Sequence, residues 1–307
     1  MSTQDDYRPE TRRVAQRFSA AAHRYDAAAY LQRVVREELE SRVATFAALQ
    51  PRCVVDLGAG TGHAALALKR RFGDALVLAV DIAPGMLAVA GERMGWRDRV
   101  LDGKLGHRFE RICADTHRLP IATGSCELAF SSLMLQWSHD LDAAFVEIRR
   151  VLKPGGLLAF ASFGPRTLHE LRAAWASVDD QPHVGVFADM HDLGGALARA
   201  GFSEPVLDVD LHELRYSNAR ALMQDLKAIG AANAVRGRAR GLTGRSRFAR
   251  MAAAYEQWRS EDSLPASYEV VYGLAWAAPL RPGIADAGGE VAVAVEAIRR
   301  RAEKPSA

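Results

Sequence analysis

Three aspartates stand at the ends of three successive apolar runs that are typical of buried strands. Asp56 lies near the end of the first run, Asp81 closes the second, and Asp115 comes two residues after the third. In open α/β sheets, ligands bind at the carboxyl ends of the strands, where such side chains would converge. Carboxylates accept hydrogen bonds and attract cations. These three positions would suit an ammonium group, the two hydroxyls of a ribose and the exocyclic amine of an adenine.

A glycine-rich turn, Gly58-Ala-Gly60-Thr-Gly62, comes just after Asp56. Glycine lets the backbone turn tightly and lets a ligand approach it closely. Dinucleotide-binding turns have the pattern G-x-G-x-x-G, whereas the third glycine here comes one residue earlier. Asp56 would repel a pyrophosphate but suits the ammonium of a methionine moiety. The pattern therefore favours an adenosyl cofactor over NAD, although each acid alone could also cap a helix or face solvent.

A parallel sheet is needed to bring these residues together, and the rest of the pattern predicts one. Strand-like apolar runs occur at Cys53–Leu57, Leu76–Val80, Phe109–Cys113, Glu127–Ser131 and Leu157–Phe163. Helical patterns occur at Leu31–Phe46, Gly62–Phe72, Pro84–Met94 and Asp140–Leu152, the last ending at a Lys-Pro-Gly-Gly segment. Strands that alternate with helices predict an α/β fold with a doubly wound, mostly parallel sheet.

The alternation changes beyond about residue 171. Helical patterns occur at Thr167–Val178, Asp189–Ala200, Ala219–Gly230 and Phe248–Arg259, around strand-like runs at Val206–Leu211 and Tyr268–Trp276. The polar residues 96–108 are expected to form a loop, and residues 281–307 a solvated tail.

The composition is that of an ordinary globular protein, with 49% apolar and 25% charged residues. The amino terminus has no apolar signal region, and no apolar run approaches the ~20 residues of a membrane span, so a cytoplasmic protein without membrane association is expected. Buried, reduced thiols are expected at Cys53, Cys113 and Cys126. No metal site is predicted, because ligand spacing is absent among these cysteines and among His63, His107, His117 and His139.

Four segments together resemble the class I S-adenosylmethionine-dependent methyltransferase family: Val54–Gly62, Val80–Leu87, Ala114–Pro120 and Val151–Gly156. The resemblance covers roughly residues 50–165. It implies a Rossmann-like sheet of seven strands whose last strand is antiparallel, with S-adenosylmethionine as the methyl donor. The residues that it implies for binding the donor are Tyr25, Asp56, Gly58, Gly60, Gly62, Asp81, Ile82, Asp115, Thr116, Ser131, Leu133 and Trp137.

Segments outside the sheet resemble the malonyl-acyl-carrier-protein O-methyltransferase family: Arg17–Asp26, Leu133–Trp137, Phe163–Leu168, Leu171–Trp175, Asp225–Ala231, Gly241–Arg245 and Ser267–Gly273. This resemblance runs from about residue 10 to residue 278. It implies methyl transfer to the free carboxylate of malonyl-acyl-carrier protein, early in biotin biosynthesis. Two departures are Ser132, where relatives commonly have Asn, and the long segment 96–108.

Four parts of the chain follow from these two resemblances. They are an amino-terminal helical lid at 1–49, an S-adenosylmethionine-binding core at 50–165, substrate-side elements with the last strands at 166–280, and a flexible tail at 281–307.

Methylation of a carboxylate needs positioning and electrostatics rather than a strong base, because the acceptor is already ionised at neutral pH. Tyr25 lies in the segment that, by resemblance, folds over the cofactor, and its hydroxyl could orient the methyl group or the carboxylate. Lys227 and Arg245 are candidates for binding the free carboxylate, since a cation suits that role. Each of the three could instead be a structural or solvated side chain.

Residues 215–250 contain nine Lys or Arg and one acid, Asp225, which gives a local charge of +8 in a chain of net charge +3. A basic face there would attract an acidic acyl carrier protein. RNA is less well supported, because the segment lacks interleaved aromatic residues that stack on bases. A solvated helix surface stays open as an explanation of this charge.

Two other functions of the protein also stay open. One is a methyltransferase for another carboxylate or a quinone, and the other is a related protein that serves only in binding or assembly.

Overall fold

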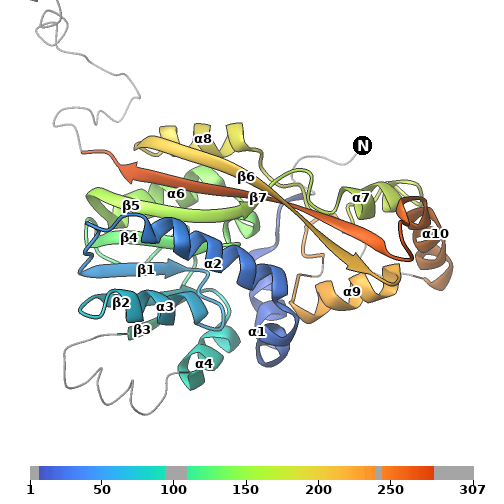
Figure 1. The fold of residues 1–307 in the computed structure, drawn as a ribbon, viewed down its shortest axis with the longest axis horizontal. Helices are drawn as coiled ribbons and strands as arrows, with labels where there is room; N and C mark the ends of the chain where they lie inside the picture. Colours follow the sequence, from blue (N-terminus) through green and yellow to red (C-terminus); the bar gives the residue numbers. More distant parts are fainter. Residues whose placement is uncertain (1–6, 94–108, 232, 239–243, 280–307) are drawn as a thin grey trace, which may run out of the picture.

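A seven-stranded sheet forms the centre of the computed structural model, which describes residues 7–93, 109–231, 233–238 and 244–279 (Figure 1). The strand order is β3-β2-β1-β4-β5-β7-β6. The strands are β1 (Cys53–Leu57), β2 (Leu76–Asp81), β3 (Phe109–Cys113), β4 (Cys126–Ser132), β5 (Leu152–Phe163), β6 (Phe202–Tyr216) and β7 (Leu264–Ala277). Neighbours are parallel from β3 to β5, whereas β7 is antiparallel to both β5 and β6. The predicted doubly wound sheet with an antiparallel last strand is confirmed.

The register of the parallel strands brings the predicted acids to one edge. Asp56 of β1 pairs with Ala79 of β2, so the next turn along β1 lies beside Asp81. Asp81 in turn pairs with Cys113, the last residue of β3. The turns that follow β1, β2 and β3 therefore lie next to one another, as a parallel sheet requires.

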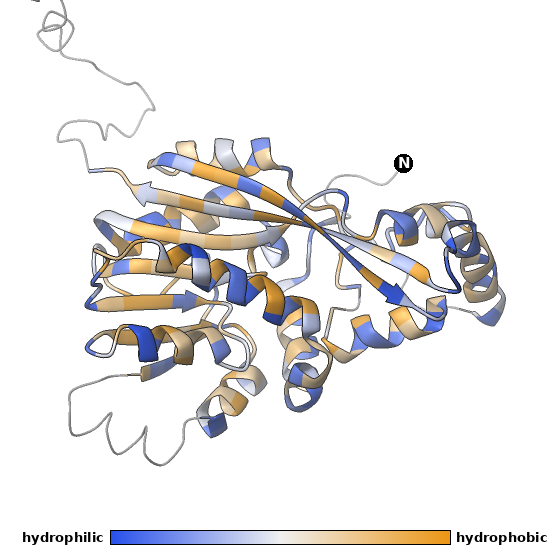
Figure 2. Cartoon of the chain, viewed as in Figure 1, coloured by the Kyte–Doolittle hydropathy of each residue, from blue (hydrophilic) through white to orange (hydrophobic). Residues whose placement is uncertain are grey.

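Two apolar clusters cover the two faces of the sheet. On one face, α2 (Tyr30–Ala44) and α3 (His63–Arg71) bury aliphatic residues such as Leu39 and Leu68 against alternate strand residues such as Val54. On the other face, α6 (Leu141–Val151) and α8 (Met190–Arg199) pack against residues such as Val55. Figure 2 shows that the central strands are hydrophobic along most of their length. This is the pattern of strands buried on both faces.

Three further helices gather at the far end of β6 and β7, which extend together beyond the other strands (Figure 1). They are α7 (His169–Ala176), α9 (Ala219–Ala228) and α10 (Arg245–Tyr255). The amino-terminal helix α1 (Thr11–Ala28) packs against α9 on one side and against α4 (Pro84–Arg93) on the other. The 3-10 turns η2 (Leu135–Trp137) and η3 (Glu256–Trp258) follow β4 and α10. Helix α1 thus lies between α4 and α9.

Three strands are longer than their sequence patterns predict by five residues or more. β6 and β7 pair from Phe202 with Ala277 to Tyr216 with Leu264, although charged residues along β6 interrupt its apolar pattern. β5 begins at Leu152, because the Lys-Pro-Gly-Gly segment forms a bulge in the strand and not a connection before it. A bulge accommodates the proline and the positive φ of Gly155. Pairing with neighbouring strands sets these lengths, and the periodicity of one strand carries no information about its neighbours.

The expectation of three buried thiols is wrong in part. Cys126 is buried, but Cys53 is half-buried and Cys113 is exposed. Cys113 ends β3, and β3 is the edge strand of the sheet, so one side of it has no neighbouring strand. None of the described helices is long and apolar enough to span a bilayer. The predicted loop 96–108 and tail 281–307 lie outside the described residues.

Candidate active site

The glycine turn after β1 is held against the end of β2 by hydrogen bonds. Oδ2 of Asp81 accepts from the backbone N–H of Gly60 at 2.8 Å, and its Oδ1 accepts from the backbone N–H of Ala83 at 2.7 Å. Gly58 has a φ of +74°, and an added Cβ there would lie 2.4 Å from Cβ of Met134. Only glycine allows this backbone to pass so close to its neighbour.

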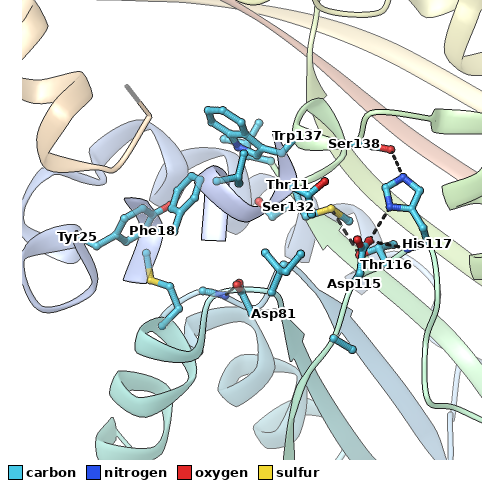
Figure 3. Close-up of a pocket in the computed structure, with 18 residues that line it drawn as sticks. Thr11, Phe18, Tyr25, Asp81, Asp115, Thr116, His117, Ser132, Trp137 and Ser138 are labelled. Carbon is cyan, nitrogen blue, oxygen red and sulfur yellow. Dashed lines mark hydrogen bonds and ion pairs between the residues drawn. The ribbon is translucent and has the colours of Figure 1, made fainter. Parts of the chain in front are cut away.

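A first cavity opens above this turn, at the carboxyl edge of the sheet; we call it the strand-edge cavity (Figure 3). It brings together nine of the predicted residues: Tyr25, Gly58, Gly60, Asp81, Ile82, Asp115, Thr116, Leu133 and Trp137. Sequence reasoning had missed others that line it: Thr11, Val14, Phe18, Met86, Ala114, His117, Ser132, Met134 and Ser138. Thr11, Val14 and Phe18 share one face of α1, and their helical spacing was the signal that could have identified them.

Asp115 and His117 form one corner of the strand-edge cavity. Nδ1 of His117 lies 2.6 Å from Oδ1 of Asp115, and its Nε2 lies 2.8 Å from the hydroxyl of Ser138. Burial alone would raise the pKa of Asp115, but the bonds from the backbone and ring of His117 lower it below its ordinary value. The carboxylate therefore stays ionised and can accept a hydrogen bond. His117, to which the sequence analysis gave no role, orients this acid.

Asp56 lines a second cavity, which shares Tyr25, Gly58, Gly60 and Ser132 with the first; we call it the polar cavity. Its side chain is 1% exposed, and its Oδ2 has no hydrogen-bond partner among the described residues. Burial, with the charge of Asp81 second, raises the pKa of Asp56 to about 8. Burial also raises the pKa of Asp81. Arg36, which also lines the polar cavity, lowers the pKa of Asp56 but does not outweigh burial. The buried Asp56 and the half-buried Asp81 could accept hydrogen bonds from a cationic ligand such as the ammonium of a methionine moiety.

Gly62 and Ser131 are not among the described residues that line either cavity. Gly62 begins α3 with a φ of +83°, and an added Cβ would lie 2.8 Å from Cβ of Ala90. Ser131 is fully buried, and its neighbour Ser132 lines both cavities instead. Successive strand residues point to opposite faces, so a shift of one residue decides which serine faces the cavity.

An aromatic wall made of Phe18, Tyr25 and Trp137 separates the strand-edge cavity from a third cavity. The Phe18 and Trp137 rings meet edge to face at 5.3 Å between centroids, and Phe18 and Tyr25 lie 6.4 Å apart (Figure 3). Burial, followed by the nearby carboxylates of Asp81 and Asp26, raises the pKa of the Tyr25 phenol. Tyr25 therefore stays protonated at neutral pH and can donate a hydrogen bond, but it cannot act as a base.

The third cavity, which we call the large cavity, has a volume of about 520 Å³. It lies among α1, α7, α9 and β7, and Phe18, Tyr25, Leu133 and Trp137 line both it and the strand-edge cavity. Most of its wall is apolar, but Arg13, Arg17, Lys227 and Arg238 also line it. A molecule in this cavity would lie next to a ligand in the strand-edge cavity, because the four shared residues line both cavities.

Lys227 and Arg245, the two predicted carboxylate-binding residues, have different positions. Lys227 lines the large cavity and also an outer groove, whereas Arg245, which begins α10, lines only the groove. We call this outer surface the basic groove, and its charged lining consists of Arg17, Arg24, Arg220, Lys227 and Arg245. Arg245 thus lines neither the strand-edge cavity nor the large cavity. Lys227 lies where the large cavity and the basic groove meet.

The basic residues of 215–250 do not all face the groove. Arg238 donates to Glu10 at 3.0 Å, Arg247 pairs with Asp179, and Arg215 lies 2.8 Å from Glu213. The pKa of Asp179 falls to about 2, because hydrogen bonds, first from Arg247, outweigh the effect of burial. The sequence charge of this segment is therefore divided between internal ion pairs and the basic groove.

Known proteins resemble this chain over most of its length. Residues 55–160, which run from within β1 to within β5, match the family described as a methyltransferase domain. A malonyl-[acyl-carrier protein] O-methyltransferase of Halorhodospira halophila is 48% identical over 294 residues, which cover 95% of this chain and 96% of that protein. The chain belongs to the malonyl-[acyl-carrier protein] O-methyltransferase family.

The match to the malonyl-[acyl-carrier protein] O-methyltransferase of Halorhodospira halophila covers 95% of this chain and so extends beyond the methyltransferase-domain match. A biotin biosynthesis bifunctional protein of Saccharophagus degradans is 37% identical over 84% of this chain and 45% of that protein. A solved structure of a candidate methyltransferase from Bacillus halodurans has a TM-score of 0.53 and 16% identity, covering 78% of this chain and 98% of that chain. The latter supports the fold, and the family assignment rests on the sequence relatives.

Proposed function

We propose that this member of the family transfers a methyl group from S-adenosylmethionine to the free carboxylate of malonyl-acyl-carrier protein. The products are the malonyl methyl ester on the carrier and S-adenosylhomocysteine, at an early step of biotin biosynthesis. One observation carries the proposal: the strand-edge cavity and the large cavity share the wall formed by Phe18, Tyr25, Leu133 and Trp137. Donor and acceptor on either side of this wall would lie next to each other.

The acids at the sheet edge supply a binding group for each part of the donor. Asp56 would pair with the ammonium of the methionine moiety, which would give its Oδ2 the hydrogen-bond partner that it lacks among the described residues. Asp81 would accept from the ribose hydroxyls, and Asp115, held by His117, would accept from the adenine amine. Ile82, Leu133 and Trp137 would enclose the adenosine with apolar surface.

The transfer needs no proton movement. An oxygen of the malonyl carboxylate forms the new bond to the methyl carbon, while the carbon–sulfur bond breaks and its electron pair stays on sulfur. Two charges, the carboxylate and the sulfonium, disappear together. Catalysis then depends on alignment in a site shielded from water. The aromatic wall, which includes the protonated Tyr25, is the part of the chain suited to that alignment.

The carrier protein would dock on the basic groove. Acyl carrier proteins are acidic, and four cations of the groove come from α1, α9 and the start of α10: Arg24, Arg220, Lys227 and Arg245. Lys227 also lines the large cavity, which the acyl group would enter. Charge complementarity of this kind raises the rate of association and weakens with added salt.

Incubation of the purified protein with S-adenosylmethionine and malonyl-acyl-carrier protein tests the proposal. We expect mass spectrometry of the carrier to detect one added methyl group, and liquid chromatography to detect an equal amount of S-adenosylhomocysteine. Acetyl-carrier protein, which lacks the free carboxylate, is the control and should not react. Transfer to a quinone or to aconitate with none to malonyl-carrier protein, or donor binding without turnover, would contradict the proposal.

A further inference from the structure

Two arginines of α1 line the large cavity, which has no carboxylate among its described lining residues. Arg13 and Arg17 are four residues apart and therefore lie on one face of the helix. Nε of Arg13 and Nη1 of Arg17 are buried and have no hydrogen-bond partner among the described residues. Buried guanidinium nitrogens normally donate to an acceptor. Both side chains are only partly buried and line the large cavity, so an anion in that cavity could supply the acceptor.

The surrounding charges do not supply that anion. No aspartate or glutamate is among the described residues that line the large cavity. Glu10 is the nearest carboxylate to Arg13, at 4.0 Å, but Arg238 already donates to it at 3.0 Å. Burial, followed by the positive charges of Arg13 and Arg238, lowers the pKa of Arg17. The cavity thus holds an excess of positive charge inside a mostly apolar wall.

The position of the pair relative to the aromatic wall suggests its use. Phe18, which follows Arg17 directly, lines both the large cavity and the strand-edge cavity. Arg13 and Arg17 therefore line the same cavity as Phe18, and Arg17 is the residue next to this part of the wall. A guanidinium group binds a carboxylate through two parallel hydrogen bonds, which holds the carboxylate in a defined orientation.

We infer that Arg13 and Arg17 bind the free carboxylate of the acyl substrate and select acyl groups that end in a carboxylate. This inference rests on the proposed function, and it assigns to α1 the role that sequence reasoning had given to Lys227 and Arg245. The phosphate of the carrier's pantetheine arm is a second possible source of negative charge, because Arg17 also lines the basic groove.

The test compares two small substrates that carry neither the phosphate nor the carrier protein. Malonyl-pantetheine has the free carboxylate, and malonamoyl-pantetheine has a neutral amide in its place. We expect Arg13→Gln and Arg17→Gln each to lower kcat/KM for malonyl-pantetheine by about 10- to 100-fold, as for the loss of a charged hydrogen-bond partner. Wild-type protein should bind the malonyl compound more tightly than the amide, and the variants should lose this preference.

Arg12→Gln is the matched control, because Arg12 is exposed on the same helix and outside the cavity lining. Arg13→Lys and Arg17→Lys keep the charge and should recover part of the activity, which separates carboxylate binding from a folding defect. Calorimetric affinity for S-adenosylmethionine should stay within about threefold of wild type in all variants.

Several outcomes would overturn the inference. Loss of activity with malonyl-carrier protein but not with malonyl-pantetheine would assign the arginines to the phosphate or the carrier. Equal weakening of malonyl- and malonamoyl-pantetheine binding would indicate a structural role. If wild-type protein fails to methylate malonyl-carrier protein, the proposed function fails, and the two binding affinities still decide the role of the arginines.

Discussion

The backbone N–H of Gly60 donates a 2.8 Å hydrogen bond to Oδ2 of Asp81, which joins the turn after β1 to the end of β2. Both carboxylate oxygens of Asp81 accept from backbone groups, since Ala83 occupies Oδ1. Asp81 therefore shapes the turn and also lines the cavity that we assign to the donor. Its remaining lone pairs are the ones available to a ribose.

Asp81→Asn should weaken S-adenosylmethionine binding, because an amide cannot accept hydrogen bonds through both of its side-chain atoms. Loss of a charged acceptor corresponds to about 1.5–3 kcal/mol, or roughly a 10- to 100-fold increase in Kd. Isothermal titration calorimetry measures this change. Glu110→Gln, on the exposed side of β3, is the control and should bind as wild type does. An unchanged Kd in Asp81→Asn would remove this residue from the donor site.

Binding of S-adenosylmethionine at pH 7 should release a proton from Asp56. Burial raises the pKa of Asp56 to about 8, so the carboxyl is mostly protonated at pH 7 before the ligand binds. The ammonium of the ligand favours the ionised form and expels the proton. Calorimetry in two buffers of different ionisation enthalpy measures the protons released, and Asp56→Asn should release fewer. Equal release from both proteins would show that Asp56 does not face the ammonium.

The same shift predicts a stability trend in the ligand-free protein. A carboxyl whose pKa is raised by folding stabilises the native state below its unfolded pKa of 3.8, and this contribution is lost as pH rises toward about 8. Between these two pKa values Asp56 is ionised only in the unfolded state, so the free energy of unfolding should fall by up to about 1.4 kcal/mol per pH unit. Urea unfolding at pH 5 and pH 8 measures it. In Asp56→Asn the fall should be smaller, and an equal fall would contradict the assignment.

Tyr25→Phe should slow turnover and leave donor affinity nearly unchanged. The variant keeps the ring that packs near Phe18 but removes the hydroxyl that could orient the reacting groups. We expect kcat to fall by about 10- to 100-fold, the scale seen when one preorganised donor is removed. Because burial raises the pKa of Tyr25, the wild-type rate should show no ionisation of this group near neutral pH.

Single-turnover measurements with malonyl-carrier protein and calorimetry with S-adenosylmethionine separate the two effects of Tyr25→Phe. Tyr30→Phe is the control, since Tyr30 is 59% exposed. A Kd that rises by the same factor as the rate falls would make Tyr25 a binding residue only.

Arg245→Glu and Arg220→Glu should raise KM for malonyl-carrier protein without changing KM for malonyl-pantetheine. Both side chains line the basic groove, outside the large cavity. Reversal of one charge at a partly solvated interface should raise KM by about 10-fold at low salt, with a smaller effect at high salt. Arg250→Glu, exposed on α10 but outside the groove lining, is the control. Equal effects on both substrates would place the residue at the acyl group instead.

Gly58→Ala should destabilise the protein and weaken donor binding. The alanine would have to adopt the positive φ of Gly58, and its Cβ would lie 2.4 Å from Cβ of Met134. Backbone strain and overpacking together suggest a loss of about 2–4 kcal/mol in the free energy of unfolding. Thermal unfolding measures this loss. Gly73→Ala is the control, since nothing lies within 4 Å of an added Cβ there.

The sequence by itself determined the sheet core and the acids at its edge. Strand periodicity, the glycine turn and the spacing of Asp56, Asp81 and Asp115 are local features, and a parallel sheet has few ways to arrange them. The lengths of β6 and β7 were underestimated, because pairing between strands distant in the chain, rather than their own apolar pattern, sets their ends.

The tertiary structure alone decided which side chains share a cavity. Ser132 rather than Ser131 faces the ligand space, His117 orients Asp115, and Arg13 and Arg17 reach the large cavity. Segments far apart in the chain, α1 and the helices after β5, enclose that cavity, so no local pattern reports their proximity. The charge of residues 215–250 was visible in the sequence, but its division between ion pairs and an open groove depends on partners such as Glu10 and Asp179 that only folding brings near.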